Sequence, residues 1–208
     1  MKTEVNPKET SRAQAFELWM ASPMPMVTLM KTFNVGHLVK VSRRTGLKFT
    51  MLMCWCIGKA AKGIGEFYLL PEQGKLFLFD RLAINIVVQN VKGGISLCDV
   101  PYSDDIGQFN TDYLELTGQA AKTCKSTELE GYMIIGTSAL PQTELDCIVN
   151  QYSGWYNNPF LVWGRYRKGL FKTTLPISLQ FHHAQMDGSH AARFLQILQD
   201  EINMLKLS

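Results

Sequence analysis

The spacing of apolar residues changes near residue 183 from a period of two to a helical period, and this change constrains the fold more than any other feature of the chain. Leu175, Ile177, Leu179 and Phe181 alternate with more polar residues, which predicts a strand over 174–182. From residue 189 to residue 205 the apolar residues form one stripe at three- and four-residue spacing, which predicts a helix. A strand followed by an amphipathic helix favours a sheet covered by helices.

Other periodic segments fill most of the remaining chain. Helical spacing predicts helices over 11–20, 36–46, 49–62 and 104–122, and Ser103 is expected to cap the last of these. Runs with β-strand character predict strands over 26–35, 75–79, 82–90, 94–98, 133–137, 146–150 and 160–167. Helices at both ends and strands mostly in hairpin-like series predict an α+β fold, in which helices pack on one face of a mixed β-sheet.

Composition limits the size of the fold and the kind of partner. The 208 residues, 46% of them apolar, suffice for one core of ordinary size, so a single domain over 1–208 is expected. The net charge of +3 is spread along the sequence and forms no basic run. Such a pattern does not favour a nucleic-acid partner.

Neither export nor membrane insertion is expected. The first residues are polar with charges of both signs, and the most apolar run, 49–58, stops at Lys59, so no secretory signal, membrane span or membrane partner is predicted. The five cysteines are scattered without a Cys-x-x-Cys pair, which indicates neither a disulfide framework nor a structural zinc site. A cytoplasmic location fits this cysteine usage best.

Adjacent histidines at the end of the last predicted strand are the strongest candidates for chemistry. Side chains alternate along a strand, so His182 and His183 point to opposite faces, and His183 shares its face with apolar residues. That setting disfavours a protonated imidazole and suits a general base, while a purely structural histidine remains an alternative. Asp187 follows at the strand-to-helix junction. A zinc site that also used His190 is less favoured, because no fourth ligand is evident.

Four segments resemble chloramphenicol acetyltransferases, which belong to a superfamily of CoA-dependent acyltransferases. The segment HHAQMDG at 182–188 resembles their active-site signature, which dihydrolipoyl acyltransferases share. The segment PYSDDIGQF at 101–109 and the segment SALP at 138–141 resemble motifs of the drug-acetylating branch, and Arg12 and Phe16 match a further pair of residues. The resemblance covers nearly the whole chain and implies a two-layer α+β sandwich.

The resemblance also implies an activity. It implies direct transfer of an acetyl group from acetyl-CoA to a hydroxyl of chloramphenicol or a related small molecule, without a metal or an acyl-enzyme. His183 matches the general base, and Ser138 matches the serine that stabilises the oxyanion. Asp187 matches an aspartate that pairs with an arginine, here Arg12, to hold the site together instead of orienting the imidazole directly.

The resemblance also implies contacts with the cofactor and an assembly of several chains. Lys48, Arg165 and Tyr166 lie where it suggests weak contacts with CoA, the cations for phosphate and the ring for stacking. A homotrimer with its sites between subunits is implied, so that His183 of one chain would face a pocket of the next.

The sequence departs from the family at three positions near the expected acceptor. Trp19 replaces a tyrosine, Gln142 a tryptophan and Val162 a threonine, which leaves the acceptor open. A larger-acyl or thiol-accepting transferase of the dihydrolipoyl type is a second hypothesis, disfavoured because no lipoyl domain or linker precedes the domain. A catalytically silent trimeric binding protein is a third.

Overall fold

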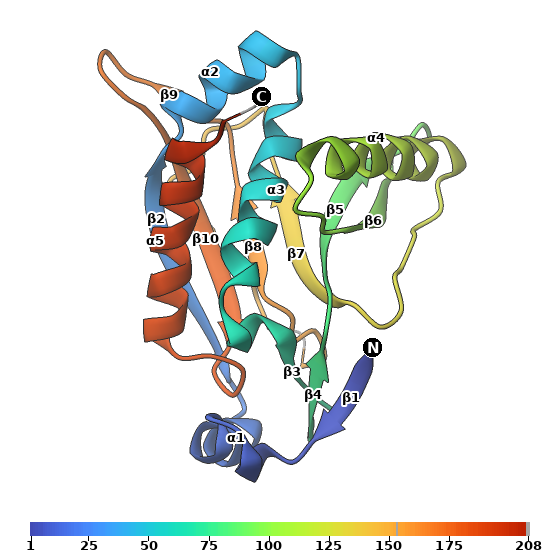
Figure 1. Cartoon of the computed structure of the whole chain (residues 1–208), viewed down its shortest axis with the longest axis vertical. Helices are drawn as coiled ribbons and strands as arrows, with labels where there is room; N and C mark the ends of the chain where they lie inside the picture. The colour runs from blue at the N-terminus through green and yellow to red at the C-terminus, as the bar shows by residue number, and fades with distance from the viewer. Residues whose placement is uncertain (153, 207–208) are drawn as a thin grey trace.

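The computed structural model describes residues 1–152 and 154–206, and it contains a large mixed sheet with helices over one face (Figure 1). The sheet has seven strands, in the order β2-β10-β8-β7-β5-β6 with β9 paired to β10. Their bounds are β2 Met26–Asn34, β5 Leu82–Gln89, β6 Ile95–Pro101, β7 Met133–Ala139, β8 Phe160–Trp163, β9 Arg167–Lys168 and β10 Thr173–His182. The expected α+β fold is confirmed.

The sheet mixes parallel and antiparallel pairs. β7 runs parallel to β5 and to β8, whereas β10 runs antiparallel to β2 and to β8, and β5 forms an antiparallel pair with β6. Parallel neighbours need a long crossover, and α4 lies in the crossover between β6 and β7. The long strand β10 thus pairs with β2 from the first part of the chain and with β8 and β9 from the last part.

Three helices, α3, α4 and α5, lie over one face of the sheet in Figure 1. The helices are α1 Ala13–Met20, α2 Gly36–Thr45, α3 Phe49–Lys62, α4 Ile106–Thr123 and α5 Gly188–Met204, with short 3-10 turns at Pro7–Glu9 and Gly65–Tyr68. Most of the α3 side chains are buried, as the apolar residues around its circumference predict. It lies beside α5 over the sheet, and its buried residues belong to the core.

A second, smaller sheet corrects the expected series of hairpins. β4 (Lys75–Phe79) does not pair with β5 but lies between β1 (Lys2–Val5) and β3 (Leu69–Glu72). No sequence pattern predicts β1 or β3. Charged residues in β1 hide its strand character, and only pairing with a strand more than seventy positions away satisfies its backbone.

Three local expectations were wrong. Residues 146–150 form no strand; the Asn150 carbonyl instead accepts a hydrogen bond from Gln180 at 2.8 Å. The segment 160–167 divides into β8 and β9 because the chain leaves the sheet at Gly164. Asp105 caps α4, accepting from the amides of Gly107 and Gln108, whereas the Ser103 hydroxyl accepts from the Asp105 amide before the helix begins.

One junction positions the candidate site. β10 ends at His182 and α5 begins at Gly188, so residues 183–187 form a short connection beside the start of β2. The helix α1 lies at this end of the molecule (Figure 1). Within residues 1–152 and 154–206, no helix combines the length and the apolar character needed to cross a bilayer.

Candidate active site

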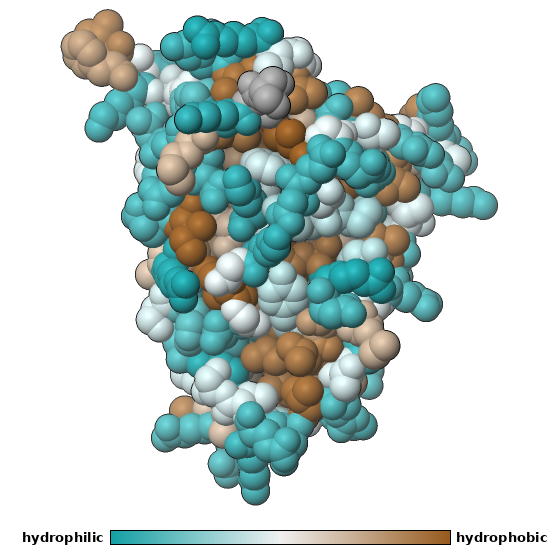
Figure 2. All heavy atoms as spheres, in the orientation of Figure 1, coloured by the Kyte–Doolittle hydropathy of each residue, from teal (hydrophilic) through white to brown (hydrophobic). Residues whose placement is uncertain are grey.

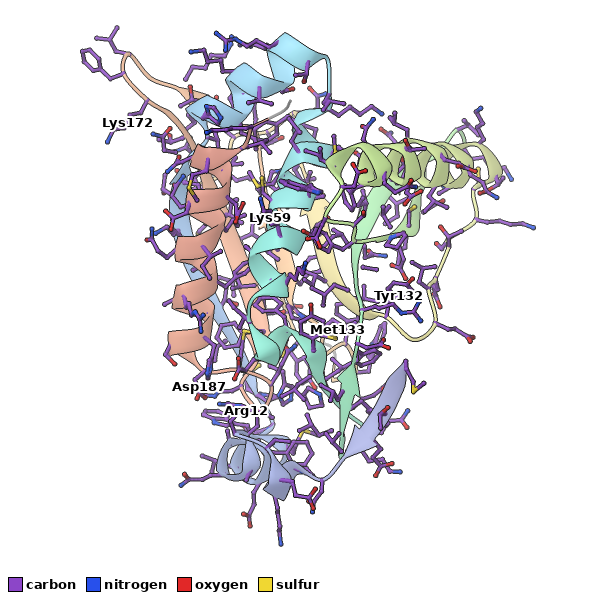
Figure 3. The ribbon with its side chains drawn as sticks, viewed as in Figure 1. Arg12, Lys59, Tyr132, Met133, Lys172 and Asp187 are labelled. Carbon is purple, nitrogen blue, oxygen red and sulfur yellow. The ribbon has the colours of Figure 1, made fainter. Side chains whose placement is uncertain are left out.

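Arg12 holds the strand-to-helix junction together. Its side chain is 2% exposed, and two of its nitrogens donate to the two carboxylate oxygens of Asp187, each at 2.6 Å. It also donates to the backbone carbonyls of His183 at 2.8 Å and Ala184 at 3.3 Å. The guanidinium lowers the pKa of Asp187 below its ordinary value. Figure 3 shows the two side chains directed at one another, so one buried cation links α1 to the turn that carries His183.

The His183 imidazole lies between an aromatic ring and a carboxylate. The indole of Trp19 stacks on it with ring centroids 4.3 Å apart and an angle of 7° between the planes. Its Nδ1 is 3.4 Å from Oδ1 of Asp187, and its side chain is 25% exposed. The backbone amide of His183 donates to the Pro25 carbonyl at 2.8 Å. The ring is therefore held in place, and part of it reaches solvent.

His182 has a different environment. It is 1% exposed, and its Nδ1 accepts a hydrogen bond from the Ala184 amide at 3.1 Å. Burial, and to a lesser degree the neighbouring His183, lowers the pKa of His182 to about 4. His182 is thus a neutral imidazole that completes the turn.

His190 also takes part in the local structure. Its Nδ1 accepts from the Asp187 amide at 3.1 Å, and its Nε2 lies 3.3 Å from a Glu66 carboxylate oxygen. Across the part of the chain that the structure describes, no three His, Cys, Asp or Glu side chains form a group that could hold a metal ion.

Ser138 lies in a cleft of about 640 Å³ near the end of β7. The walls come from α4, β5, β7 and the loop after β7, and they include Tyr113, Thr117, Ile86 and Leu140. Such a volume suits a small organic ligand or the arm of a larger one. Ser138 therefore faces a space where a substrate could bind, and His183 does not line it.

The three residues expected near a cofactor lie at the same end of the molecule as this cleft. Lys48 lines the cleft, and its Nζ is 5.8 Å from the Tyr113 ring centroid. Arg165 pairs with Glu144 at 3.3 Å and does not line the cleft. The Tyr166 ring packs on Phe49 at 5.3 Å between centroids and is partly buried against the core.

His183 and Ser138 do not meet within one chain. Ser138 pairs with Val162 on β8, and Val162 pairs with Ser178 on β10. His183 lies five residues beyond Ser178, about 17 Å along a strand, and two strand spacings add about 10 Å. The two side chains are thus roughly 20 Å apart in one chain, because sheet pairing fixes both positions.

The three divergent positions are distributed between these two places. Trp19 covers His183, Gln142 lies exposed in the wall of the cleft, and Val162 is 5% exposed next to Ser138 on the sheet. Neither the place of Tyr113 in the cleft nor the stacking of Trp19 is predicted from the sequence. Tyr113 belongs to the apolar stripe of α4, a pattern that does not distinguish a core residue from one that lines a cleft.

Comparison with known proteins identifies the family. A model of the chloramphenicol acetyltransferase family matches residues 2–199. The chain belongs to this family. Its relatives include chloramphenicol acetyltransferase 3 of Escherichia coli, 26% identical over 208 residues, with 97% of each chain covered. A chloramphenicol acetyltransferase of Clostridium perfringens is 26% identical over 209 residues, covering 96% of this chain and 98% of the relative. Family membership supports acetyl transfer as the class of activity.

Solved structures show the same fold. A chloramphenicol acetyltransferase superposes with a TM-score of 0.83 at 19% identity, covering 96% of this chain and 99% of that chain. A truncated catalytic core of the 2-oxoacid dehydrogenase multienzyme complex from Thermoplasma acidophilum gives 0.72 at 15% identity, covering 97% and 99%. At these identities the similarity establishes the fold alone.

Proposed function

We propose that this protein transfers an acetyl group from acetyl-CoA to a hydroxyl of a small molecule, chloramphenicol or a related acceptor. The observation that carries the proposal is the setting of His183, a partly exposed imidazole fixed between Trp19 and Asp187 in a member of this family. A cytoplasmic location is part of the proposal, since acetyl-CoA is available there.

His183 acts as the general base in this proposal. The charge of the Asp187 carboxylate, 3.4 Å away, favours a proton on Nδ1, although Nδ1 makes no hydrogen bond within the described residues. This tautomer leaves the lone pair of Nε2 for the acceptor hydroxyl. Nε2 takes the hydroxyl proton as the oxygen attacks the thioester carbonyl, and returns it to the CoA sulfur as that bond breaks. Such proton transfer contributes roughly 10² to 10⁴ in rate.

Ser138 stabilises the oxyanion in the tetrahedral intermediate. Its hydroxyl borders the cleft in which the acyl end of the donor would bind. Loss of one such donor costs on the order of 10² to 10³ in turnover. Lys48 in the cleft wall offers a cation to a CoA phosphate, and Arg165 and Tyr166 contribute weakly from beyond the cleft.

Arg12 and Asp187 act through position. A bidentate pair with one member buried fixes the turn that presents His183, and the further bonds to the carbonyls of His183 and Ala184 orient the backbone. Neither side chain needs to touch substrate in this mechanism.

A homotrimer with its sites between subunits accounts for the separation of His183 and Ser138. Two groups roughly 20 Å apart in one chain can act on one bond only if they come from different copies. Helix α1 supports the same assembly: none of its eight residues is buried, and Leu18 is 64% exposed. So short a helix gains its stability from packing, which a second copy would provide.

Residues near the expected acceptor position depart from the family pattern, which changes the contacts that an acceptor could make. The Trp19 indole lies flat against His183 and carries no phenolic hydroxyl, and Val162 offers an apolar side chain beside Ser138. A site that lacks a hydrogen-bond partner for a substrate hydroxyl loses selectivity for it. We therefore include hydroxylated acceptors other than chloramphenicol.

Thiol release from acetyl-CoA, measured with a panel of acceptors, tests the activity. Chloramphenicol, other small alcohols and dihydrolipoamide belong in the panel. Acceptor-dependent release that falls at least about 10²-fold in His183→Ala is expected. Release that survives this substitution would overturn the assignment, transfer to dihydrolipoamide alone would identify a thiol acceptor, and no release with any acceptor would identify a silent homologue.

Mixing two inactive variants tests the assembly. His183→Ala chains retain Ser138, and Ser138→Ala chains retain His183. In mixed trimers about one site in four would receive both intact residues, one from each neighbour. Co-expression should therefore restore about a quarter of wild-type turnover, whereas separately purified and unexchanged variants should not. Activity no greater than the sum of the two parents would contradict a site between subunits.

A further inference from the structure

The hairpin between β9 and β10 carries two apolar side chains that nothing in the chain covers. Leu170 is 90% exposed and Phe171 is 91% exposed. We call these two residues the hairpin tip. It projects from the body beside α2 in Figure 1 and forms an apolar protrusion next to a hydrophilic surface in Figure 2. Paired apolar side chains of such exposure at a protruding turn indicate a binding surface.

Five exposed cations lie on the hairpin and on the neighbouring helix α2. Lys168 and Lys172 flank the hairpin tip, and Lys40, Arg43 and Arg44 lie exposed on α2. The two segments adjoin, since the Val35 amide, just before α2, donates to the Thr173 carbonyl at 2.8 Å. We call these five residues the basic end, and Figure 3 places Lys172 on the projecting loop.

The charges of the basic end remain available to a partner. Among the ion pairs of residues 1–152 and 154–206, none includes a member of the basic end. The neighbouring Arg165 and Arg167, by contrast, pair with Glu144 and Asp146. The fold therefore gathers five cations at one end of the molecule, near an apolar tip, although the sequence contains no basic run.

The cleft of Ser138 extends to this end of the molecule. Lys48 in its wall follows α2 by three residues. Thr143, also in its wall, accepts a hydrogen bond at 2.7 Å from the Arg165 amide at the base of the hairpin. A partner seated on the basic end would therefore lie close to the entrance used by the donor.

The apolar tip distinguishes between kinds of partner. CoA alone is a hydrophilic polyanion, for which the cations would suffice and two exposed apolar residues would be of no use. A bilayer fits the combination of charge and apolar tip, but it would cover the end at which the donor arm enters. An acidic protein that carries the arm fits the charge, the tip and the position together.

We propose that the basic end and the hairpin tip dock an acidic carrier domain, which supplies the acyl group on a phosphopantetheine arm. This inference rests on the proposed function and extends its donor from CoA to a carrier. The acceptor oxygen forms the bond to the acyl carbon as the carbon–sulfur bond breaks, and the hydroxyl proton passes through His183 to the thiol of the arm. The arm shares its reactive end with CoA and uses the same cleft.

The test compares two acetyl donors in the whole protein. One is an acidic acyl carrier protein loaded with an acetyl-phosphopantetheine arm, and the other is acetyl-pantetheine, which has the same thioester but no protein and no phosphate. We expect kcat/KM for the carrier to exceed that for acetyl-pantetheine at least about tenfold at low salt, and to fall as salt rises. Equal values would overturn the proposal. Inactivity with acetyl-CoA as well would instead contradict the proposed function.

Two double variants assign the effect to the surface. Leu170→Ser with Phe171→Ser removes the apolar tip, and Lys168→Glu with Lys172→Glu reverses the flanking charge. Each should lower kcat/KM for the carrier about tenfold and leave that for acetyl-pantetheine unchanged, which also reports on folding. Leu78→Ser, at a half-exposed position on β4 in the small sheet, is the matched control and should change neither.

Binding to lipid vesicles tests the remaining alternative, in which this surface contacts a membrane. Sedimentation with phosphatidylserine–phosphatidylcholine vesicles should show no binding that depends on the hairpin tip. Binding that is lost in the Leu170→Ser, Phe171→Ser variant, together with an unchanged rate for the carrier, would make this surface a membrane contact and overturn the proposal.

Discussion

The indole of Trp19 lies parallel to the imidazole of His183, with 4.3 Å between the ring centroids and 7° between the planes. Trp19 belongs to α1 and His183 to the connection after β10, so the stack joins two elements from opposite ends of the sequence. Flat contact limits rotation of the imidazole and covers one of its faces, while the remaining edge stays open to solvent.

Removal of this stack should lower turnover without abolishing it. Trp19→Ala loses an aromatic contact of about 0.5 to 1.5 kcal/mol, which corresponds to roughly a 2- to 10-fold decrease in kcat if the imidazole loses its orientation. Trp19→Phe keeps a stacked ring and should retain most of the rate. Steady-state kinetics on both variants check this expectation. Equal rates in Trp19→Ala and the wild type would show that the stack does not position the base.

Loss of Arg12 should destabilise the protein. Arg12→Met leaves the carbonyls of His183 and Ala184 without their buried donor, at a cost of about 1 to 3 kcal/mol in the free energy of unfolding. Arg12→Lys keeps the charge but cannot bridge the same acceptors, because an ammonium lacks the planar fork of a guanidinium. Urea unfolding should rank the wild type above Arg12→Lys, and Arg12→Lys above Arg12→Met. A stability of Arg12→Met equal to that of the wild type would contradict the role of this residue.

Mild acid should destabilise the fold through His182. Burial lowers the pKa of His182 to about 4 in the folded protein, whereas an unfolded histidine titrates near about 6.5. The unfolded chain therefore binds more protons between these two values, and the free energy of unfolding falls as the pH decreases from about 6.5 to about 4. His182→Asn removes the titrating group and should show a smaller decrease. Chemical unfolding at pH 7 and pH 5 measures the decrease in the free energy of unfolding for the wild type and for His182→Asn. Equal decreases in the two proteins would be inconsistent with this interpretation.

A methyl group at Gly136 should disrupt the sheet next to Ser138. A Cβ at this position would lie 2.2 Å from a Phe160 ring carbon and 2.8 Å from the Tyr156 hydroxyl oxygen. Gly136→Ala should therefore cost about 1 to 3 kcal/mol in the free energy of unfolding and lower turnover as β7 and β8 shift. Gly63→Ala, at the residue that follows α3, is the control, since a Cβ there meets no atom within 4 Å. If Gly136→Ala left the free energy of unfolding unchanged, the Phe160 ring would move aside without an energetic cost.

Much of the fold could be predicted from local patterns. The alternation in β10 and the stripe of α5 each depend on one face of one element, so a single sequence contains the full signal. β1 could not be predicted in this way, because three of its four residues are exposed and its partner β4 decides its conformation. The prediction of a strand over 146–150 was wrong for the converse reason. The apolar residues of this segment do not form a strand because no neighbouring strand is available to pair with them.

The sequence by itself determined which residues are candidates for chemistry and on which kind of element each one lies, since residue type and periodicity are local properties. The resemblance implied that Arg12 pairs with Asp187, but only the tertiary structure decided the bidentate geometry of that pair. It also decided that sheet register holds Ser138 far from His183 in one copy. It also gathered cations from two distant segments into the basic end. The physical reason is common to all three: contacts between residues remote in sequence depend on how the elements pack, and a local pattern carries no information about that packing.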